Sequence, residues 1–235
     1  MVVKSPCCDG KKMNAAPWSF SKIKAFQQCP KQFYHEKVIK QYPFKMNDAV
    51  RYGNEFHKAA ENYIQGKGLD KRFEFARPAL DSLNAKEGDK LCEYRMGLTN
   101  RLEPCTFGAR NVWFRGIADL LILDHANNLA WVIDYKTGKS AQYADSGQLE
   151  LMAMAVFRHF PHIDTVRAGL LFVVCNELIK DSFIASDSKK LWIKWADSFT
   201  DMKYAYENDV WNPNPSGLCR RHCPVVECSH NGSNK

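Results

Sequence analysis

The segment WVIDYKTG, residues 131–138, constrains the fold most, because it places an aspartate and a lysine two residues apart inside an apolar run. Side chains alternate between the two faces of a strand, so Asp134 and Lys136 should share one face and Tyr135 the other. The preceding apolar segment, residues 112–124, also has strand character and contains one internal acid, Asp119. The four residues HANN lie between the two segments and are typical of a turn. We therefore expect two antiparallel strands.

The register of these strands determines which side chains meet. If Asp124 lies opposite Leu129, then Asp119 lies opposite Asp134, with about 5 Å between their β-carbons. Two carboxylates this close repel each other unless a cation lies between them, and such oxygen ligands suit Mg²⁺ or Mn²⁺. A bound divalent ion polarises a phosphoryl oxygen and activates water, and Lys136 can orient that water or stabilise developing charge. The pattern fits metal-assisted phosphodiester hydrolysis, and the alternative is an exposed ion pair beside a turn.

The remaining chain alternates between helical and strand-like patterns. Ser21 can cap a first helix, and Gly66 can end a second. Further helices are expected at about 70–90, 146–160 and 186–209, and further strands within 90–105 and 165–185. This order predicts an α/β or α+β domain in which helices flank a central mixed sheet.

Composition excludes some classes of protein. With 235 residues, 45% of them hydrophobic, the chain suits one core of ordinary size. No apolar run approaches the roughly 18 residues of a membrane span, and the N-terminus lacks the apolar centre of a secretory signal. We therefore expect a cytoplasmic protein, in the host cytoplasm if its source is viral, without a membrane partner. The formal net charge of +7 favours polyanions but is also common in proteins that bind none.

The nine cysteines favour metal ligation over disulfides, because no export signal accompanies them. Cys219, Cys223 and Cys228 lie within ten residues of a polar, proline-containing segment. Cys29 is the fourth candidate and would tie the two ends of the domain together, while His222 and His230 could serve a zinc ion instead. We expect a tail at residues 1–16, the main domain at 17–210, and a metal-binding segment at 211–235 that packs on the Cys29 region.

Four short motifs occur in a defined order: Gly53-Asn-Glu-Phe-His57, Gly116-Ile-Ala-Asp119, Asp134-Tyr-Lys136, and Gln148 opening the next helix. In content and order they resemble the RecB-like exonuclease branch of the PD-(D/E)XK nuclease superfamily, over about residues 17–230. The resemblance implies a restriction-endonuclease-like core. It also implies an Mg²⁺- or Mn²⁺-dependent deoxyribonuclease, most simply an exonuclease, that acts on single-stranded DNA or duplex ends in recombination, repair or replication.

The resemblance also implies a role for each matching residue. Asp119, Asp134 and Lys136 would be catalytic, and the metal ligands would be His57, Asp119, Asp134 and the backbone carbonyl of Tyr135. Gln148 would support the site or contact DNA, and Glu93 would stand behind the ligands as a supporting group. Taken alone, His57 could be an ordinary helix residue and Gln148 only part of a first helical turn.

The cysteines resemble those of a subset of the superfamily, the AddB-like and CRISPR-adaptation nucleases. In that subset one cysteine before the nuclease core and three after it bind a 4Fe-4S cluster. This chain has C-x3-C-x4-C where the subset commonly has C-x2-C-x5-C, so zinc stays an alternative. A recombination or helicase partner and a homo-oligomer are further expectations. The rival function is a non-catalytic DNA- or partner-binding module that uses the same fold and cysteines.

Overall fold

A computed structural model describes residues 17–142 and 144–234 of the chain. It divides into two compact units, one of residues Met46–Ile193 and one of the described residues up to Lys45 together with Lys194–Lys235. The expected tail at residues 1–16 lies outside the described residues, and the boundary expected at 210/211 stays a prediction. Among the residues described, none of the helices combines the length and the apolar character needed to cross a membrane.

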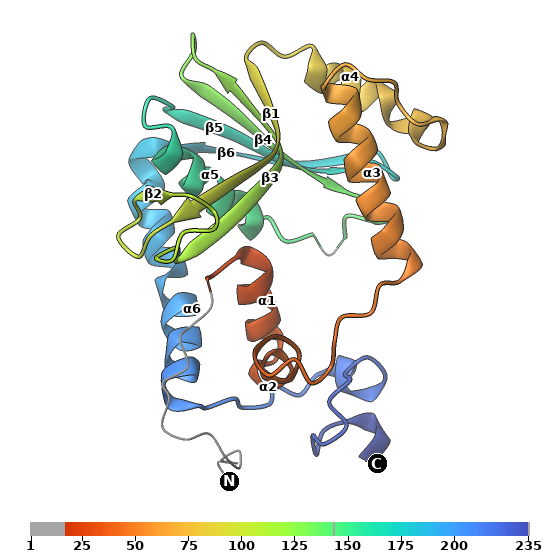
Figure 1. The fold of residues 1–235 in the computed structure, drawn as a ribbon, viewed down its shortest axis with the longest axis vertical. Coiled ribbons are helices and arrows are strands. Elements are labelled where there is room, and N and C mark those ends of the chain that lie inside the picture. Colours follow the sequence, from red (N-terminus) through yellow and green to blue (C-terminus); the bar gives the residue numbers. More distant parts are fainter. Residues whose placement is uncertain (1–16, 143, 235) are drawn as a thin grey trace. The chain divides into compact units, whose positions relative to one another are not determined.

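The Met46–Ile193 unit is built on one six-stranded sheet (Figure 1). Its strands are β1 (Asp89–Leu98), β2 (Pro104–Cys105), β3 (Phe114–Asp124), β4 (Leu129–Lys136), β5 (Thr165–Phe172) and β6 (Glu177–Ile184). They are arranged in the order β2-β1-β3-β4-β5-β6, and β4–β5 is the parallel pair among otherwise antiparallel ones. A parallel pair needs a long crossover, which α5 (Gly147–His159) provides. The mixed sheet flanked by helices confirms the expected fold class.

The β3–β4 register agrees with the sequence-based prediction over five residue pairs. These pairs run from Asp124 opposite Leu129 to Leu120 opposite Ile133. The ladder ends there, so Asp119 and Asp134 come one position after its last pair. The expected direct pairing of the two aspartates is therefore replaced by a local separation of the strands.

One side of the sheet packs against α3 (Asp48–Ile64), the 3-10 helix η2 (Lys71–Ala76) and α4 (Arg77–Asn84). The shared core includes Phe56, Phe73 and Leu80 from these helices, with Leu120 and Ile133 from the sheet. The side chain of Asn47 caps the start of α3, because its amide oxygen, Oδ1, accepts a hydrogen bond from the Val50 N–H at 2.9 Å. Gly66 follows its last turn with φ +84°, a conformation that glycine adopts without strain, as the sequence predicted.

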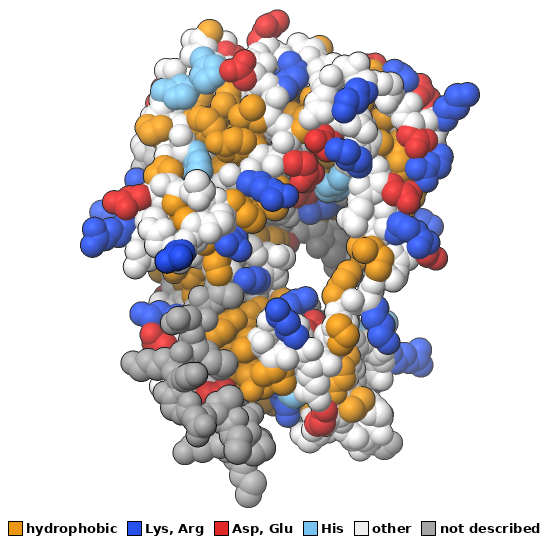
Figure 2. Space-filling model, in the orientation of Figure 1, with side chains coloured by type: hydrophobic (Ala, Val, Ile, Leu, Met, Phe, Trp, Pro, Cys, Tyr) orange, Lys and Arg blue, Asp and Glu red, His pale blue; other side chains and the backbone are white. Residues whose placement is uncertain are grey.

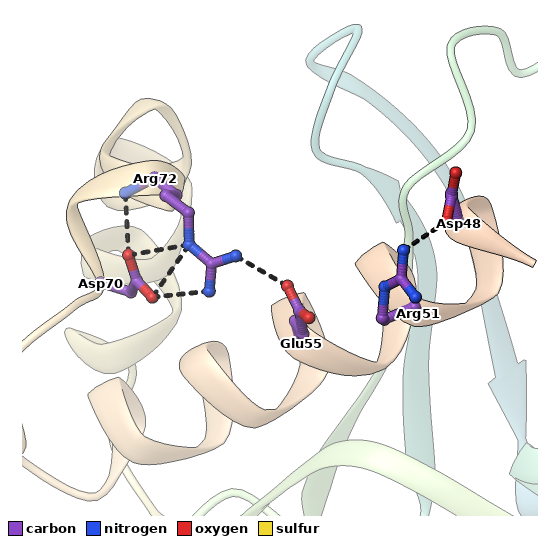
Figure 3. Close-up of polar contacts among 5 residues, drawn as sticks. All are labelled: Asp48, Arg51, Glu55, Asp70 and Arg72. Carbon is purple, nitrogen blue, oxygen red and sulfur yellow. Dashed lines mark hydrogen bonds and ion pairs between the residues drawn. The ribbon is translucent and has the colours of Figure 1, made fainter.

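Surface ion pairs connect α3 to the segment that follows it (Figure 3). Arg72 contacts Glu55 of α3, with 2.7 Å from Nη1 to Oε2, and Asp70, with 2.9 Å from Nη2 to Oδ2. Arg51 pairs with Asp48 in the first turn of α3. Such exposed pairs contribute about 0–1 kcal/mol each. Acidic and basic side chains are interspersed over the face that carries α3 (Figure 2), so this surface is not uniformly basic.

Helix α5 packs on the opposite side of the sheet and is buried along most of its length. Gly116 of β3 allows its close approach, because a β-carbon at that position would lie 2.9 Å from Sδ of Met152. Gln148 lies in the first turn of α5, so the packing of α5 on the sheet also fixes the position of the Gln148 side chain.

The other unit contains α1 (Phe20–Gln28), α2 (Pro30–Phe33) and the π-helix η1 (Tyr34–Val38). Ser19 caps α1, since its hydroxyl oxygen accepts the Lys22 N–H at 3.4 Å, so the prediction of Ser21 as the cap was wrong. Trp211 packs against Tyr34 and Tyr206 with ring centroids 5.1 Å and 5.0 Å away. The remaining helices are η3 (Ala185–Asp187), α6 (Ser188–Asn208), η4 (Gly217–Arg220) and η5 (Gly232–Asn234), and α6 runs from one unit into the other.

Candidate active site

The Asp119 side chain occupies the point where the β3–β4 ladder ends. Its Oδ2 accepts a hydrogen bond from the backbone N–H of Tyr135 at 2.6 Å, and only 11% of the side chain is exposed. A carboxylate thereby replaces the carbonyl that a continued ladder would offer to this N–H. The bond fixes one oxygen of Asp119 and leaves Oδ1 for other contacts.

Asp134, Lys136 and Gln148 form a closed polar group. Lys136 Nζ lies 2.6 Å from Asp134 Oδ2 and donates to Gln148 Oε1 at 3.1 Å. The Gln148 amide nitrogen donates in turn to Asp134 Oδ1. The prediction that Asp134 and Lys136 share a face is confirmed, and Gln148 of α5 holds both of them.

His57 comes from α3 and points both ring nitrogens at other site residues. Nε2 lies 3.1 Å from the Tyr135 carbonyl oxygen, and because a carbonyl only accepts, Nε2 is the donor. Nδ1 lies 3.3 Å from Asp119 Oδ1 and 4.0 Å from Glu93 Oε1. The imidazole therefore turns its Nδ1 lone pair toward two carboxylates when the ring is neutral.

Gly53 lies one helical turn before His57 and is close to the segment after β4. A β-carbon at Gly53 would lie 3.3 Å from Oγ1 of Thr137, tighter than an ordinary van der Waals contact. The absence of a side chain at Gly53 therefore lets α3 approach the end of β4. This gives the Gly-x-x-x-His spacing a packing reason.

Glu93 approaches the same group from β1. Its backbone is left-handed, φ 51°, and β1 pairs with β3 on either side of it but not at Glu93 itself. His57, Glu93 and Asp119 each offer a ligand atom within 4.8 Å of the other two, and they are the one group of this kind among the described residues. The sequence indicated a supporting role for Glu93, whereas its geometry is that of a potential ligand.

Burial and mutual repulsion shift the pKa values of these acids. The pKa of Asp134 is raised, mainly by burial and then by the charge of Asp119, although Lys136 opposes the shift. Burial, followed by Asp119, also raises the pKa of Glu93. Burial lowers the pKa of His57, but the carboxylates of Asp119, Asp134 and Glu93 outweigh it and the net pKa is raised. Neighbouring carboxylates thus act to raise all three pKa values, and for His57 they decide the direction of the net shift.

The donor set suits a divalent cation. Two carboxylates and one imidazole converge, and the buried Asp134 Oδ2 lies beside them with the Lys136 ammonium 2.6 Å away as its compensating charge. A buried carboxylate oxygen is costly unless a cation compensates it. Carboxylate oxygens suit Mg²⁺ and Mn²⁺ alike. The arrangement can hold such an ion beside a lysine, as phosphodiester hydrolysis requires.

The four cysteines singled out in the sequence lie around one pocket in the other unit. Cys29, Cys219, Cys223 and Cys228 all line it, together with His230. Backbone N–H groups of Asn214 and Ser216 donate to Sγ of Cys29 and Cys219, both at 3.4 Å. Burial raises the pKa of the Cys223 thiol, and the other three thiols raise it further.

Comparison with known proteins agrees with this fold. The family model described as the PD-(D/E)XK nuclease superfamily matches residues 17–228, nearly the whole chain. The chain therefore belongs to the PD-(D/E)XK nuclease superfamily. None of the curated proteins matches the sequence.

Two solved structures match this chain at low sequence identity. One is a protein from Eubacterium rectale named as a candidate exonuclease, with 12% identity, a TM-score of 0.53 and coverage of 89% of each chain. The other is SSO0001, with 12% identity, a TM-score of 0.48 and coverage of 96% of this chain and 90% of that one. The first of these likenesses supports the fold alone.

Proposed function

We propose that the protein is an Mg²⁺- or Mn²⁺-dependent deoxyribonuclease that hydrolyses phosphodiester bonds of DNA. One observation carries this proposal: Asp119, Asp134 and Lys136 gather at the end of the β3–β4 ladder in a chain of the PD-(D/E)XK superfamily. The position of His57 and Glu93 beside Asp119 adds the ligands that a divalent ion needs. A binding-only module would have no use for acids that repel the phosphates of DNA.

Each residue has a distinct task in this mechanism. A divalent ion bound among the carboxylates would supply Lewis acidity toward the scissile phosphate and its attacking water. Tyr135 N–H holds Asp119, and Gln148 holds Asp134, so neither acid needs to reorganise during the reaction. The Lys136 ammonium is positioned to orient the water and to stabilise negative charge that develops on the phosphoryl oxygens.

We infer further that the enzyme is an exonuclease acting on single strands or duplex ends in DNA recombination, repair or replication. The name of the Eubacterium rectale protein and the RecB-like order of motifs support this inference. We place it in the cytoplasm, alone or as a homo-oligomer, with a helicase or recombination protein as its partner.

The test of exonuclease action compares cleavage of end-labelled linear single strands, linear duplex and closed circular DNA in Mn²⁺ or Mg²⁺. Loss of linear DNA alone is the expected result, and equal loss of circular DNA would contradict exonuclease action.

The four cysteines are proposed to hold a 4Fe-4S cluster, with Zn²⁺ as the alternative. The resemblance of the cysteine order to the 4Fe-4S subset, and the four thiols around one pocket, support the cluster. Anaerobic purification followed by iron, sulfide and zinc analysis tests the assignment. About four irons per chain is the expected result, and one zinc without iron would contradict it.

A further inference from the structure

A groove of about 480 Å³ lies over strands β4, β5 and β6 of the sheet, apart from the candidate active site. Its lining includes Trp131, Ile133, Arg167, Gly169, Leu178 and Lys180. The strand register places these residues in adjacent rows on one face: Trp131 is opposite Arg167, and Gly169 lies between Ile133 and Lys180. The proposed nuclease mechanism uses none of them.

Gly169 leaves room for the Leu178 side chain to lie across the floor of this groove. A β-carbon at that position would lie 2.9 Å from Cδ1 of Leu178 and 3.6 Å from Cδ1 of Ile133. A glycine inside a strand weakens the strand and often marks a site where a ligand or another backbone approaches closely. The floor is thus apolar and is formed by the side chains of Leu178 and Ile133 over Gly169.

The rim of the groove carries positive charge in fixed positions. The Arg167 guanidinium lies 5.0 Å from the centre of the Trp131 ring, and Lys86 Nζ lies 3.7 Å from the centre of the same ring. Lys180 is exposed at the far side, and Asp181 is the single acid among the described lining residues. Because the ring anchors two of these cations, they need little ordering to meet an anion.

The chemistry of the surface distinguishes between two kinds of anionic partner. Single-stranded nucleic acid binds through aromatic rings on which its bases stack. Trp131 already contacts two cations, and the remaining apolar surface is aliphatic, from Ile133 and from Leu178, which is 53% exposed. Aliphatic floor and basic rim together match a chain that carries both apolar side chains and carboxylates.

We propose that this groove binds an acidic peptide segment of a partner protein, one in which Asp or Glu alternates with large apolar residues. Its apolar side chains would pack on Leu178 and Ile133, and its carboxylates would pair with Arg167 and Lys180. The partner is defined by this chemistry alone. The proposal does not depend on the nuclease activity.

Fluorescence anisotropy with labelled peptides tests the proposal. One peptide alternates Glu with Leu and Phe, and a second carries Lys in place of every Glu. The full-length protein should bind the acidic peptide at least about tenfold more tightly than the basic one. Lys180→Glu and Arg167→Glu should each weaken acidic-peptide binding at least about tenfold, and Gly169→Ala should weaken it by displacing Leu178. Equal binding of both peptides by the wild-type protein would overturn the proposal.

Two controls separate this groove from the DNA site. Lys189→Glu reverses an exposed charge on α6 outside the groove and should leave peptide binding unchanged. Labelled oligothymidylate should bind the Lys180→Glu protein and the wild type equally, and cleavage of linear DNA should also be equal. A selective loss of oligothymidylate binding in Lys180→Glu would identify the groove as a nucleic-acid surface and refute the peptide assignment. Circular dichroism checks that each variant is folded. If Arg167→Glu unfolds the protein, Lys180→Glu still tests the groove, because Lys180 is exposed and its substitution should not disturb the fold.

Discussion

The Asp119 carboxylate joins β3 to the backbone of Tyr135, with 2.6 Å between Oδ2 and N, at the position where the two strands stop pairing. Because the ladder ends here, the Asp119 carboxylate, in place of a backbone carbonyl of β3, accepts the hydrogen bond from the Tyr135 N–H. This contact holds Asp119 beside the Asp-x-Lys segment without direct pairing of two carboxylates. The site thus follows from the strand register together with this local break.

Gln148 should act through its contacts with Asp134 and Lys136. Gln148→Ala removes two hydrogen bonds of the polar group, each contributing about 1 kcal/mol, so kcat should fall about tenfold or more. The KM for DNA should change little, because the bonds orient catalytic groups. Steady-state cleavage of a labelled linear strand measures both quantities. A change confined to KM would instead make Gln148 a DNA contact.

Metal binding should weaken as the pH falls. The pKa values of His57 and Glu93 are both raised, so each group holds a proton at a higher pH than an ordinary histidine or glutamate. A bound cation must displace these protons, and its affinity should fall about tenfold per pH unit for each proton displaced. Calorimetric titration with Mn²⁺ at several pH values measures the slope. His57→Gln should flatten the histidine part of the slope, and an unchanged slope would refute this role.

Glu93 should contribute directly to cation affinity. Glu93→Gln keeps the size of the side chain but removes its charge from the group formed with His57 and Asp119. Mn²⁺ affinity should fall at least about tenfold. Glu103→Gln changes an exposed acid outside this group and serves as the matched control. Equal affinity in the two variants would show that Glu93 stays outside the coordination sphere.

Alternation of side chains along strands made part of this site predictable. The Asp-x-Lys pattern gave the shared face of Asp134 and Lys136, and a four-residue turn gave the β3–β4 register. The place of Glu93 among the potential ligands could not be predicted, because nothing in a strand sequence indicates a left-handed backbone at a residue that is not glycine. The helix cap was misplaced because Ser19 and Ser21 are both suitable cap residues in the sequence, and the helix begins after Ser19.

The cysteine set should stabilise the unit that contains it. Cys223→Ser removes one of four thiols around the pocket, so a bound metal group would be weakened or lost. The melting temperature should fall by about 2–4 °C for each kcal/mol lost. Cys175→Ser changes a half-buried thiol outside the set and should have a smaller effect. Equal melting temperatures for the Cys223→Ser protein and the wild type would count against a bound metal group.

The most direct test of the account measures DNA cleavage and DNA binding together for Asp134→Ala and Asp124→Ala. Asp134 belongs to the candidate active site, whereas Asp124 lies at the far end of β3 and bonds to Asn127. In Mn²⁺, Asp134→Ala should lose at least about 100-fold in cleavage rate while still binding DNA, and Asp124→Ala should match the wild type. Wild-type cleavage by Asp134→Ala, or failure of the wild-type protein to cleave any DNA with Mn²⁺ or Mg²⁺, would contradict the proposed active site.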